Sequence, residues 1–156
     1  MITSSALASL HYLALGIGMG AVFARGIALR KMIADTGSRL ESMQRVLFAD
    51  NAWGIAALLW IITGLLRAFA GYEKGTAFYL ANPLFHLKLT LFALIFLLEL
   101  KPMIVFIKWR IAQAKGRNID NFSVLPRLKW MNDCEVVLIV VIVFVASAMA
   151  RGITYN

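Results

Sequence analysis

Four long runs of hydrophobic positions, separated by short polar connections, dominate the chain. They cover about Ser4–Ala28, Val46–Gly71, Leu84–Ile107 and Met131–Ala150. Each run is long enough to cross ~30 Å of hydrocarbon as an α-helix, which needs about 20 apolar residues. Little of the chain lies outside them. The pattern therefore predicts an all-α integral membrane protein, in which residues 1–156 form one domain, a bundle of four transmembrane helices.

The composition agrees with this prediction. Of the 156 residues 61% are hydrophobic, and the mean hydropathy is +0.77. A soluble domain of this size could not bury so much apolar surface. The single cysteine, Cys134, cannot form an internal disulfide and matches no metal-ligand spacing. No nucleophile–base pair or phosphate-binding loop appears, which argues against hydrolytic chemistry.

The net charge of +8 is distributed unevenly. Most basic residues lie in or beside the first and third connections: Arg25, Arg30, Lys31, Arg39, Arg45, Lys101, Lys108, Arg110, Lys115, Arg117, Arg127 and Lys129. The second connection carries only Lys74, opposed by Glu73. The positive-inside rule therefore predicts that the basic connections are cytoplasmic and that both termini lie outside. Basic loops favour anionic lipid headgroups as partners, rather than nucleic acid.

Proline positions refine the helix boundaries. Asn82-Pro83 predicts the start of the third helix, because proline suits a first helical turn. Pro102 predicts a kink or an early end near the cytoplasmic end of that helix. The stretch 112–128, which contains Gly116 and Pro126, is predicted to be a loop.

The only two histidines, His11 and His86, lie in the first and third predicted helices. These helices run parallel, so both imidazoles are expected at a similar depth. Facing side chains in a bundle are a common way to bind haem, which makes His11 and His86 candidate iron ligands for haem b. Gly18 follows His11 by seven residues and shares its face, which would leave room for a flat macrocycle. Alternatively, the glycines of this helix simply permit close helix packing.

The second helix presents Trp53, Trp60 and Arg67 at seven-residue intervals on one face. Arg67 is expected in the same leaflet as the two histidines. Its guanidinium could bind a haem propionate or another anion. The alternative is that Arg67 extends to the lipid headgroups.

Lys88 competes with His86 for the interior of the bundle. Two residues of helix rotate by about 200°, so both side chains cannot face inward. Glu99, eleven residues after Lys88, returns to nearly the same face. If that face is internal, Lys88 and Glu99 are expected to form a buried ion pair, and His86 faces sideways or toward lipid. The sequence leaves both interpretations open.

Three acidic residues, Asp50, Asp133 and Glu135, are expected at the cytoplasmic starts of the second and fourth helices. Acids at these positions are favoured by the helix dipole, which is a structural role. The functional alternative is an ion pair between Asp50 and Arg25 at the cytoplasmic end of the first helix.

The runs Phe48-Ala49-Asp50 and Asn82-Pro83-Leu84-Phe85 up to Lys88, together with the ending Met149-Ala150-Arg151-Gly152, resemble a family of small bacterial membrane proteins known as domain of unknown function 2214. The resemblance covers nearly the whole chain. It implies a multi-pass protein of the bacterial inner membrane, and it implies no activity.

A more distant resemblance is to the HemJ-type protoporphyrinogen oxidases. It rests on His11, early in the first helix, and on the run His86-Leu87-Lys88. The resemblance implies bound haem b and oxidation of a porphyrinogen, with His11 and Lys88 as catalytic residues. In the closer family an aromatic residue often stands at the position of His86, so His11 and Lys88 match the two families better.

Three functions follow as hypotheses. The first is a haem-dependent oxidoreductase, in which Arg67 binds a propionate. The second is a non-enzymatic accessory subunit or assembly factor, acting in a homo-oligomer or a larger membrane complex. The third is a small transporter, whose polar path would run between the first three helices, because 136–149 contains Ser147 as its one polar residue.

Overall fold

Four long helices and one short helix form the computed structural model, which describes residues 2–72, 74–119 and 121–153. The elements are α1 (Ile2–Ala34), α2 (Arg39–Phe69), α3 (Thr76–Ala81), α4 (Pro83–Ala114) and α5 (Leu125–Ala150). Within these ranges there is no strand. Each of the four long helices is long and apolar enough to cross a membrane. The prediction of an all-α, four-span membrane protein is confirmed.

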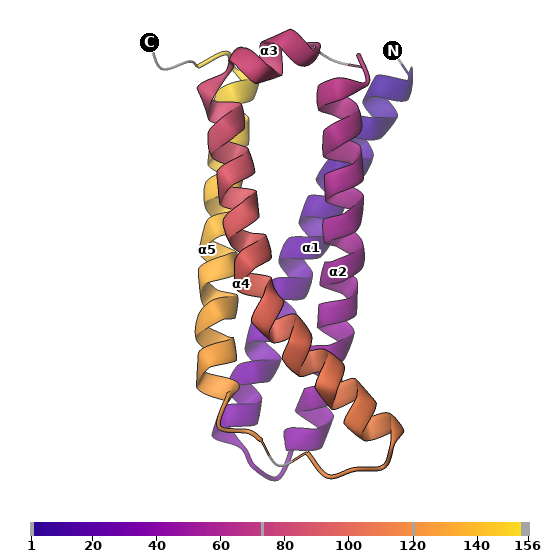
Figure 1. Ribbon diagram of the computed structural model, residues 1–156, viewed down its shortest axis with the longest axis vertical. Helices are drawn as coiled ribbons and strands as arrows, with labels where there is room; N and C mark the ends of the chain where they lie inside the picture. The colour runs from indigo at the N-terminus through magenta and orange to yellow at the C-terminus, as the bar shows by residue number, and fades with distance from the viewer. Residues whose placement is uncertain (1, 73, 120, 154–156) are drawn as a thin grey trace.

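The long helices run up and down along one axis, and α3 lies across one end (Figure 1). The start of α1 and the end of α5 are at the same end as α3, which we call the terminus end. The opposite end, the loop end, holds the connections 35–38 and 115–124. α1 packs against both α2 and α5, and α4 packs against α5. α1 is therefore the helix that joins the two halves of the bundle.

The helices extend further into the polar connections than predicted. α1 continues to Ala34, and α2 begins at Arg39, so the first connection is short. Hydrophobicity marks where a span leaves the hydrocarbon, whereas a helix continues through Arg, Lys, Glu and Met, which are good helix formers. The exposed pair Glu41–Arg45, with 2.6 Å between Oε1 and Nη2, adds i,i+4 support to the first turns of α2.

The predicted loop over 112–128 is shorter in the structure. α5 begins at Leu125 with Pro126 in its first turn, where the missing N–H costs no hydrogen bond. Pro102 does not end α4, which continues to Ala114. Figure 1 shows that α4 changes direction along its length and slants across the bundle toward α2 at the loop end. A proline within a helix accounts for such a bend, because it removes a backbone hydrogen bond.

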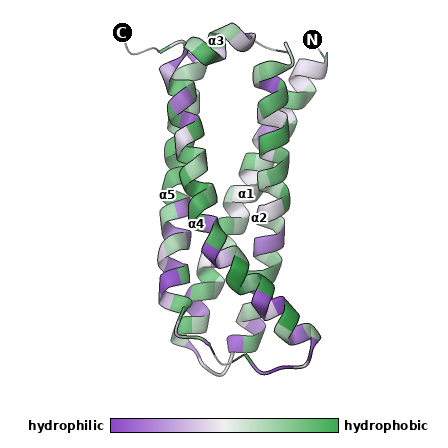
Figure 2. Cartoon of the chain, viewed as in Figure 1, coloured by the Kyte–Doolittle hydropathy of each residue, from purple (hydrophilic) through white to green (hydrophobic). Residues whose placement is uncertain are grey.

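Two large hydrophobic clusters form the core. One lies at the loop end and includes Leu29, Met32 and Phe106, and the other lies along the bundle and includes Trp53 and Ile139. A small third cluster, Ala68, Tyr79 and Phe85, lies beneath α3. Many large apolar side chains remain exposed, and Figure 2 shows that hydrophobic residues make up most of the long helices. Exposed apolar side chains are expected for helices surrounded by lipid.

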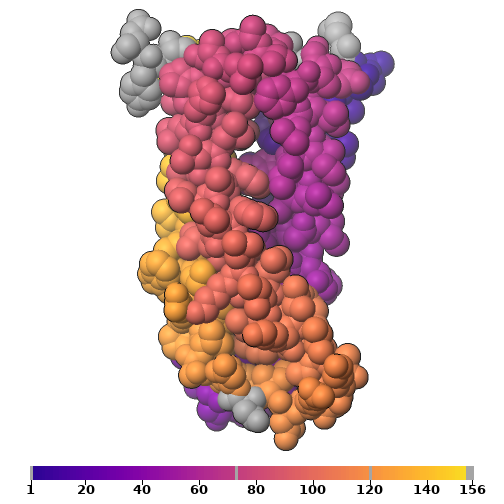
Figure 3. All heavy atoms as spheres, in the orientation of Figure 1, coloured from indigo at the N-terminus to yellow at the C-terminus, as the bar shows by residue number. Residues whose placement is uncertain are grey.

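Toward the terminus end, α2 and the first half of α4 diverge (Figure 1). The space-filling view shows a hollow between them (Figure 3). The bend of α4 explains the difference, because only the second half of the helix leans toward α2. The fold thus leaves an open region at one end and a closed one at the other.

Candidate functional site

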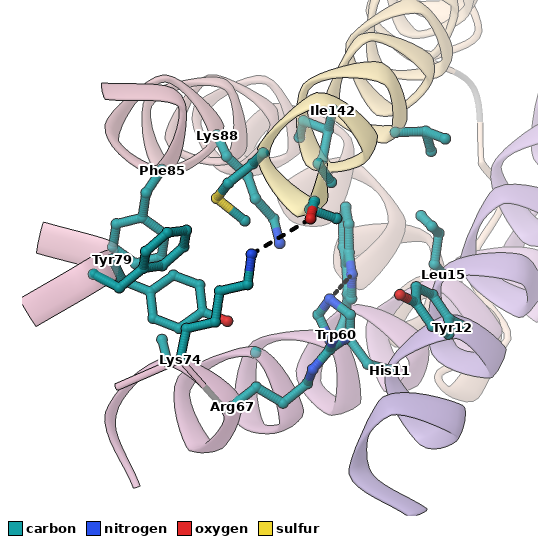
Figure 4. A pocket seen from close by; sticks show the side chains of 17 residues that line it. His11, Tyr12, Leu15, Trp60, Arg67, Lys74, Tyr79, Phe85, Lys88 and Ile142 are labelled. Carbon is teal, nitrogen blue, oxygen red and sulfur yellow. Dashed lines mark hydrogen bonds between the residues drawn. The ribbon is translucent and has the colours of Figure 1, made fainter. Parts of the chain in front are cut away.

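A pocket at the terminus end brings together three of the polar residues that the sequence singled out, His11, Arg67 and Lys88. We call it the terminus-end pocket, a cavity of about 150 Å³. Its polar and aromatic lining comprises His11, Tyr12, Trp60, Arg67, Lys74, Phe78, Tyr79, Phe85 and Lys88. Residues of α5, among them Ile142 and Met149, supply an apolar wall. Figure 4 shows the labelled side chains arranged around this space.

Three basic side chains line the terminus-end pocket: Arg67 from α2, Lys74 from the connection before α3, and Lys88 from α4. The Arg67 guanidinium lies 5.4 Å from the ring centroid of Tyr12, and the Lys74 amine lies 4.5 Å from that of Phe78. Lys74 Nζ also donates to the carbonyl of Ala150 at 3.4 Å. No Asp or Glu is found among the described residues that line the cavity. The charged residues of the described lining are therefore all basic.

A second cavity of about 250 Å³ adjoins the terminus-end pocket and shares His11, Trp60 and Lys88 with it. The rest of its lining is largely apolar and includes Ile61, Leu65 and Leu89. These side chains lie on the outward faces of α2 and α4, where they are partly exposed. The space beside these basic side chains thus continues into an apolar groove between α2 and α4. We call this second cavity the apolar groove.

His11 is held firmly by hydrogen bonds to α2. Its Nε2 accepts from the indole N–H of Trp60 at 3.0 Å, and its Nδ1 lies 2.9 Å from the hydroxyl of Thr63. That hydroxyl also donates to the carbonyl of Leu59 at 2.6 Å. The consistent assignment is a neutral imidazole that carries its proton on Nδ1. Gly64 makes room for it, since a Cβ there would lie 3.2 Å from His11 Cε1.

The structure does not bring His86 and His11 together. His86 is exposed, and its Nε2 lies 2.9 Å from the carbonyl oxygen of Leu80. Lys88 occupies the inward face of α4 instead and lines both cavities. His86 and Lys88 lie two residues apart on α4 and therefore point in different directions. Because Lys88 faces inward, the expectation that His86 faces His11 is wrong.

Gly18 does not leave room for a macrocycle. A Cβ at this position would lie 2.9 Å from Cζ3 of Trp53, so the indole already fills the space beside it. Gly18 permits close packing of α1 on α2, which was the structural alternative. Because His86 faces outward and both nitrogens of His11 are engaged, the described residues do not form a bis-histidine site for haem iron.

The second group of polar side chains surrounds Arg25, which is completely buried. Its Nε donates to Asn132 Oδ1 at 2.8 Å, and Nη1 donates to Asp50 at 3.2 Å and to Glu99 at 2.7 Å. Nη2 donates to the other oxygen of Glu99 at 3.0 Å and also to Glu135. All five N–H groups of the guanidinium have acceptors. Arg25 therefore ties α1 to α2, α4 and α5.

The expected contact between Arg25 and Asp50 is present, but Glu99 does not pair with Lys88 as expected. Both carboxylate oxygens of Glu99 accept hydrogen bonds from Arg25. Eleven residues of α-helix rise by about 16 Å, which separates Lys88 from Glu99 along α4 although they share a face. Lys88 belongs to the terminus-end pocket, whereas Glu99 belongs to the group around Arg25.

Sequence reasoning missed three members of this group. Glu135 was expected at the start of a helix, but it lies ten residues into α5 and is fully buried. Arg110 donates to Asp50 Oδ2 at 2.7 Å and to Asn51 Oδ1 at 2.8 Å. Asn132 is also buried, opposite Gly26. In the sequence, these residues were marked only as polar or charged residues within or beside apolar runs.

Two other expectations concern charges at the helix ends. Asp50 and Asp133 were expected at helix starts, but they lie eleven residues into α2 and eight residues into α5, because both helices begin earlier than predicted. Asp133 is an exposed partner of Lys129 one helical turn earlier. Arg25, counted with the basic connections in the sequence, lies within the bundle instead. The remaining basic residues named there still concentrate at the loop end.

The architecture is that of a small multi-pass membrane protein with charged groups inside its helix bundle. The family model described as "Predicted membrane protein (DUF2214)" matches residues 3–154, so the chain belongs to this family. No curated protein and no solved structure matches it. The resemblance to HemJ-type oxidases therefore stays a prediction.

Proposed function

We propose that this protein binds an amphipathic anion at the terminus-end pocket. The acidic head, a carboxylate or phosphate, lies among Arg67, Lys74 and Lys88, and the apolar body extends along the apolar groove. One observation carries the proposal: three basic side chains line a cavity that continues into an apolar groove between two helices. Small-molecule sites combine apolar walls with a few convergent polar groups in this way.

The chemistry of the basic side chains supports this assignment. Arginine binds carboxylate and phosphate groups through paired N–H donors, and lysine adds a compact charge. His11 is held in place by Trp60 and Thr63, so it forms a fixed polar wall beside the head.

The proposed location is the inner membrane of a bacterium, with the terminus end on the periplasmic side. The basic residues at the loop end favour this orientation by the positive-inside rule. An anion bound at the terminus-end pocket then comes from the outer leaflet of that membrane or from the periplasm.

The test is native mass spectrometry of the full-length protein, purified in mild detergent and stripped of lipid. Phosphatidylglycerol, oleate and haemin serve as anionic probes, and phosphatidylcholine serves as the zwitterionic control. We expect adducts with at least one anionic probe, weakened about tenfold or more by Arg67→Gln or Lys88→Gln, which corresponds to the loss of one charge-assisted hydrogen bond.

Matched controls are Arg45→Gln and Lys108→Gln, which remove exposed basic residues of α2 and α4 at the loop end. Both should bind the probes like the native protein. Equal binding by all four variants, or equal binding of phosphatidylcholine, would disprove the site. The same spectra report whether the chain is a monomer, a homo-oligomer or part of a larger complex, as the accessory-subunit hypothesis requires.

Haem b, or a porphyrin, is a second candidate ligand, with a redox role like that of HemJ-type oxidases. Its support is that His11 shares the pocket with three basic side chains able to bind propionates. The residues do not fit the bis-histidine scheme, so His11 is the single histidine available to such a ligand. An absorption spectrum before and after dithionite tests this: a Soret band that is absent from His11→Ala would support it, and a featureless native spectrum would refute it.

A further inference from the structure

The buried group around Arg25 contains more negative than positive charge. Three carboxyl groups, Asp50, Glu99 and Glu135, meet two guanidinium groups, Arg25 and Arg110. With all five groups ionised, the cluster would carry a net charge of −1. The side chains of Arg25 and Glu135 are fully buried, and those of Asp50 and Glu99 are 11% and 17% exposed. A net charge in such a place is strongly unfavourable.

The surplus charge is concentrated where Glu99 meets Glu135. Asp50 bridges Arg25 and Arg110, so its charge is balanced from two sides. Glu99 and Glu135, by contrast, both accept from the same nitrogen, Nη2 of Arg25. Two carboxylates that share one site cannot easily both be ionised, and one of them retains a proton.

One oxygen atom of Glu135 identifies the position of the surplus negative charge. Its Oε2 accepts from Arg25, whereas its Oε1 is buried and has no hydrogen-bond partner among the described residues. An unpaired oxygen of an ionised carboxylate is among the most costly groups to bury, and protonation removes most of that cost. Glu135 lies ten residues into α5, which places it about 15 Å from the loop end of that helix.

We propose that this cluster is a proton-binding site, in which the pair Glu99–Glu135 holds one proton beside the Arg25 guanidinium. Glu135 accepts from Arg25 of α1, and the same guanidinium also donates to Asp50 of α2, to Glu99 of α4 and to Asn132 of α5. With one proton the cluster is neutral. Any movement that separates Glu135 from Arg25 then releases or takes up a proton at membrane depth, as in proton relays of pumps and transporters.

A metal ion is a poorer explanation of the same residues. Arg25 occupies the centre of the cluster, where it donates to all three carboxyl groups. Among the described residues, no group of three or more His, Cys, Asp or Glu side chains is arranged to hold a metal ion. A proton needs only one carboxyl oxygen, and Glu135 Oε1 supplies it.

The test is infrared spectroscopy of the full-length protein in lipid nanodiscs at pH 7. A protonated carboxyl group gives a C=O stretching band, distinct from the carboxylate bands, that shifts after exchange into D₂O. We expect this band in the native protein. Charge balance predicts its loss in Glu135→Gln and also in Glu99→Gln, because either variant leaves two carboxylates for two guanidinium groups.

Glu41→Gln is the matched control, since Glu41 is an exposed carboxylate that pairs with Arg45 on α2, and it should keep the band. Circular dichroism and a single elution peak establish that each variant is folded. The proposal is overturned if the native protein lacks the band at pH 7, or if the band persists in folded Glu135→Gln and Glu99→Gln. This result is independent of whether the terminus-end pocket binds an anion.

Discussion

The two halves of the bundle place charged side chains in different surroundings. In the half of the bundle toward the loop end, the N–H groups of Arg25 all have acceptors, and its partners come from three other helices. At the terminus end, Arg67, Lys74 and Lys88 line open space that continues between α2 and α4. Buried ion pairs therefore link four helices in one half of the bundle, and in the other half basic side chains line a cavity.

Helix geometry explains this difference. α4 leans toward α2 only in its second half, where Arg110 donates to the carbonyl of Leu47 and to Asp50 on α2. Its first half diverges from α2, and the apolar groove lies there. Pro102, buried within α4, lies between these parts. One bent helix thus gives the protein a closed end and an open end.

The strongest test of this comparison is Arg25→Gln, which should destabilise the bundle far more than loss of an exposed arginine. It leaves three carboxyl groups with only Arg110 as a cation, and breaking a buried ion network costs about 3–5 kcal/mol. Thermal unfolding in detergent measures the effect. Arg45→Gln removes an exposed i,i+4 pair and should cost about 0.5 kcal/mol or less. Equal melting temperatures for the two variants would show that the Arg25 network does not hold the loop end closed.

Close packing along α1 gives the next largest effect. A Cβ on Gly26 would lie 2.7 Å from Nδ2 of Asn132, and one on Gly18 would lie 2.9 Å from the ring of Trp53. Substitution of either by alanine should therefore cost about 1–3 kcal/mol through overpacking.

Gly16→Ala is the matched control, since no atom lies within 4 Å of a Cβ at that position. Alanine there should leave the protein as stable as before or more stable, because of its higher helix propensity. Thermal unfolding of the three variants separates the two outcomes. If Gly16→Ala lowers the thermal stability as much as Gly18→Ala does, this face of α1 must be packed against another molecule in solution.

A smaller effect is expected at the terminus end from Trp60→Phe. The change removes the N–H that donates to Nε2 of His11 at 3.0 Å, and the loss of this hydrogen bond should cost about 0.5–1.5 kcal/mol. Trp130→Phe, at an exposed position, should be close to neutral. Probe binding should weaken in Trp60→Phe if a fixed His11 helps to form the site, and unchanged binding would remove His11 from it.

Much of this architecture could be predicted from the sequence, because membrane-spanning helices need long apolar runs and little else forms them. The residues that line the terminus-end pocket were also within reach, since Trp60 and Arg67 share one face of a helix at seven-residue spacing. The pairing of Glu99 with Arg25 could not be predicted in this way. Periodicity shows which residues share a face of one helix, but it does not show which face of another helix meets it.

The misplacement of Glu135 has a related cause. Hydropathy placed the start of the last helix at residue 131, which made Glu135 a first-turn acid. In the structure α5 begins at Leu125, because Pro126 and the following polar residues form helical turns before the apolar run. Because the helix begins six residues earlier than predicted, Glu135 is a fully buried carboxyl group and not a first-turn acid that interacts with the helix dipole.

The connection at the loop end offers the smallest and most local test, because its charges lie outside the membrane-spanning helices. The Ser38 hydroxyl donates to Asp35 at 2.6 Å and the Gly37 N–H donates at 2.9 Å, and these bonds hold the pKa of Asp35 below its usual value. Asp35 therefore stabilises the turn at pH values above the pKa of the unfolded chain, and this contribution is lost as the pH falls through the folded pKa. Ser38→Ala should raise the pKa of Asp35, measured by carboxyl ¹³C NMR in micelles. Ser123→Ala, in the other loop-end connection, should leave it unchanged; a pKa that does not move in Ser38→Ala would mean that the turn does not hold this geometry in solution.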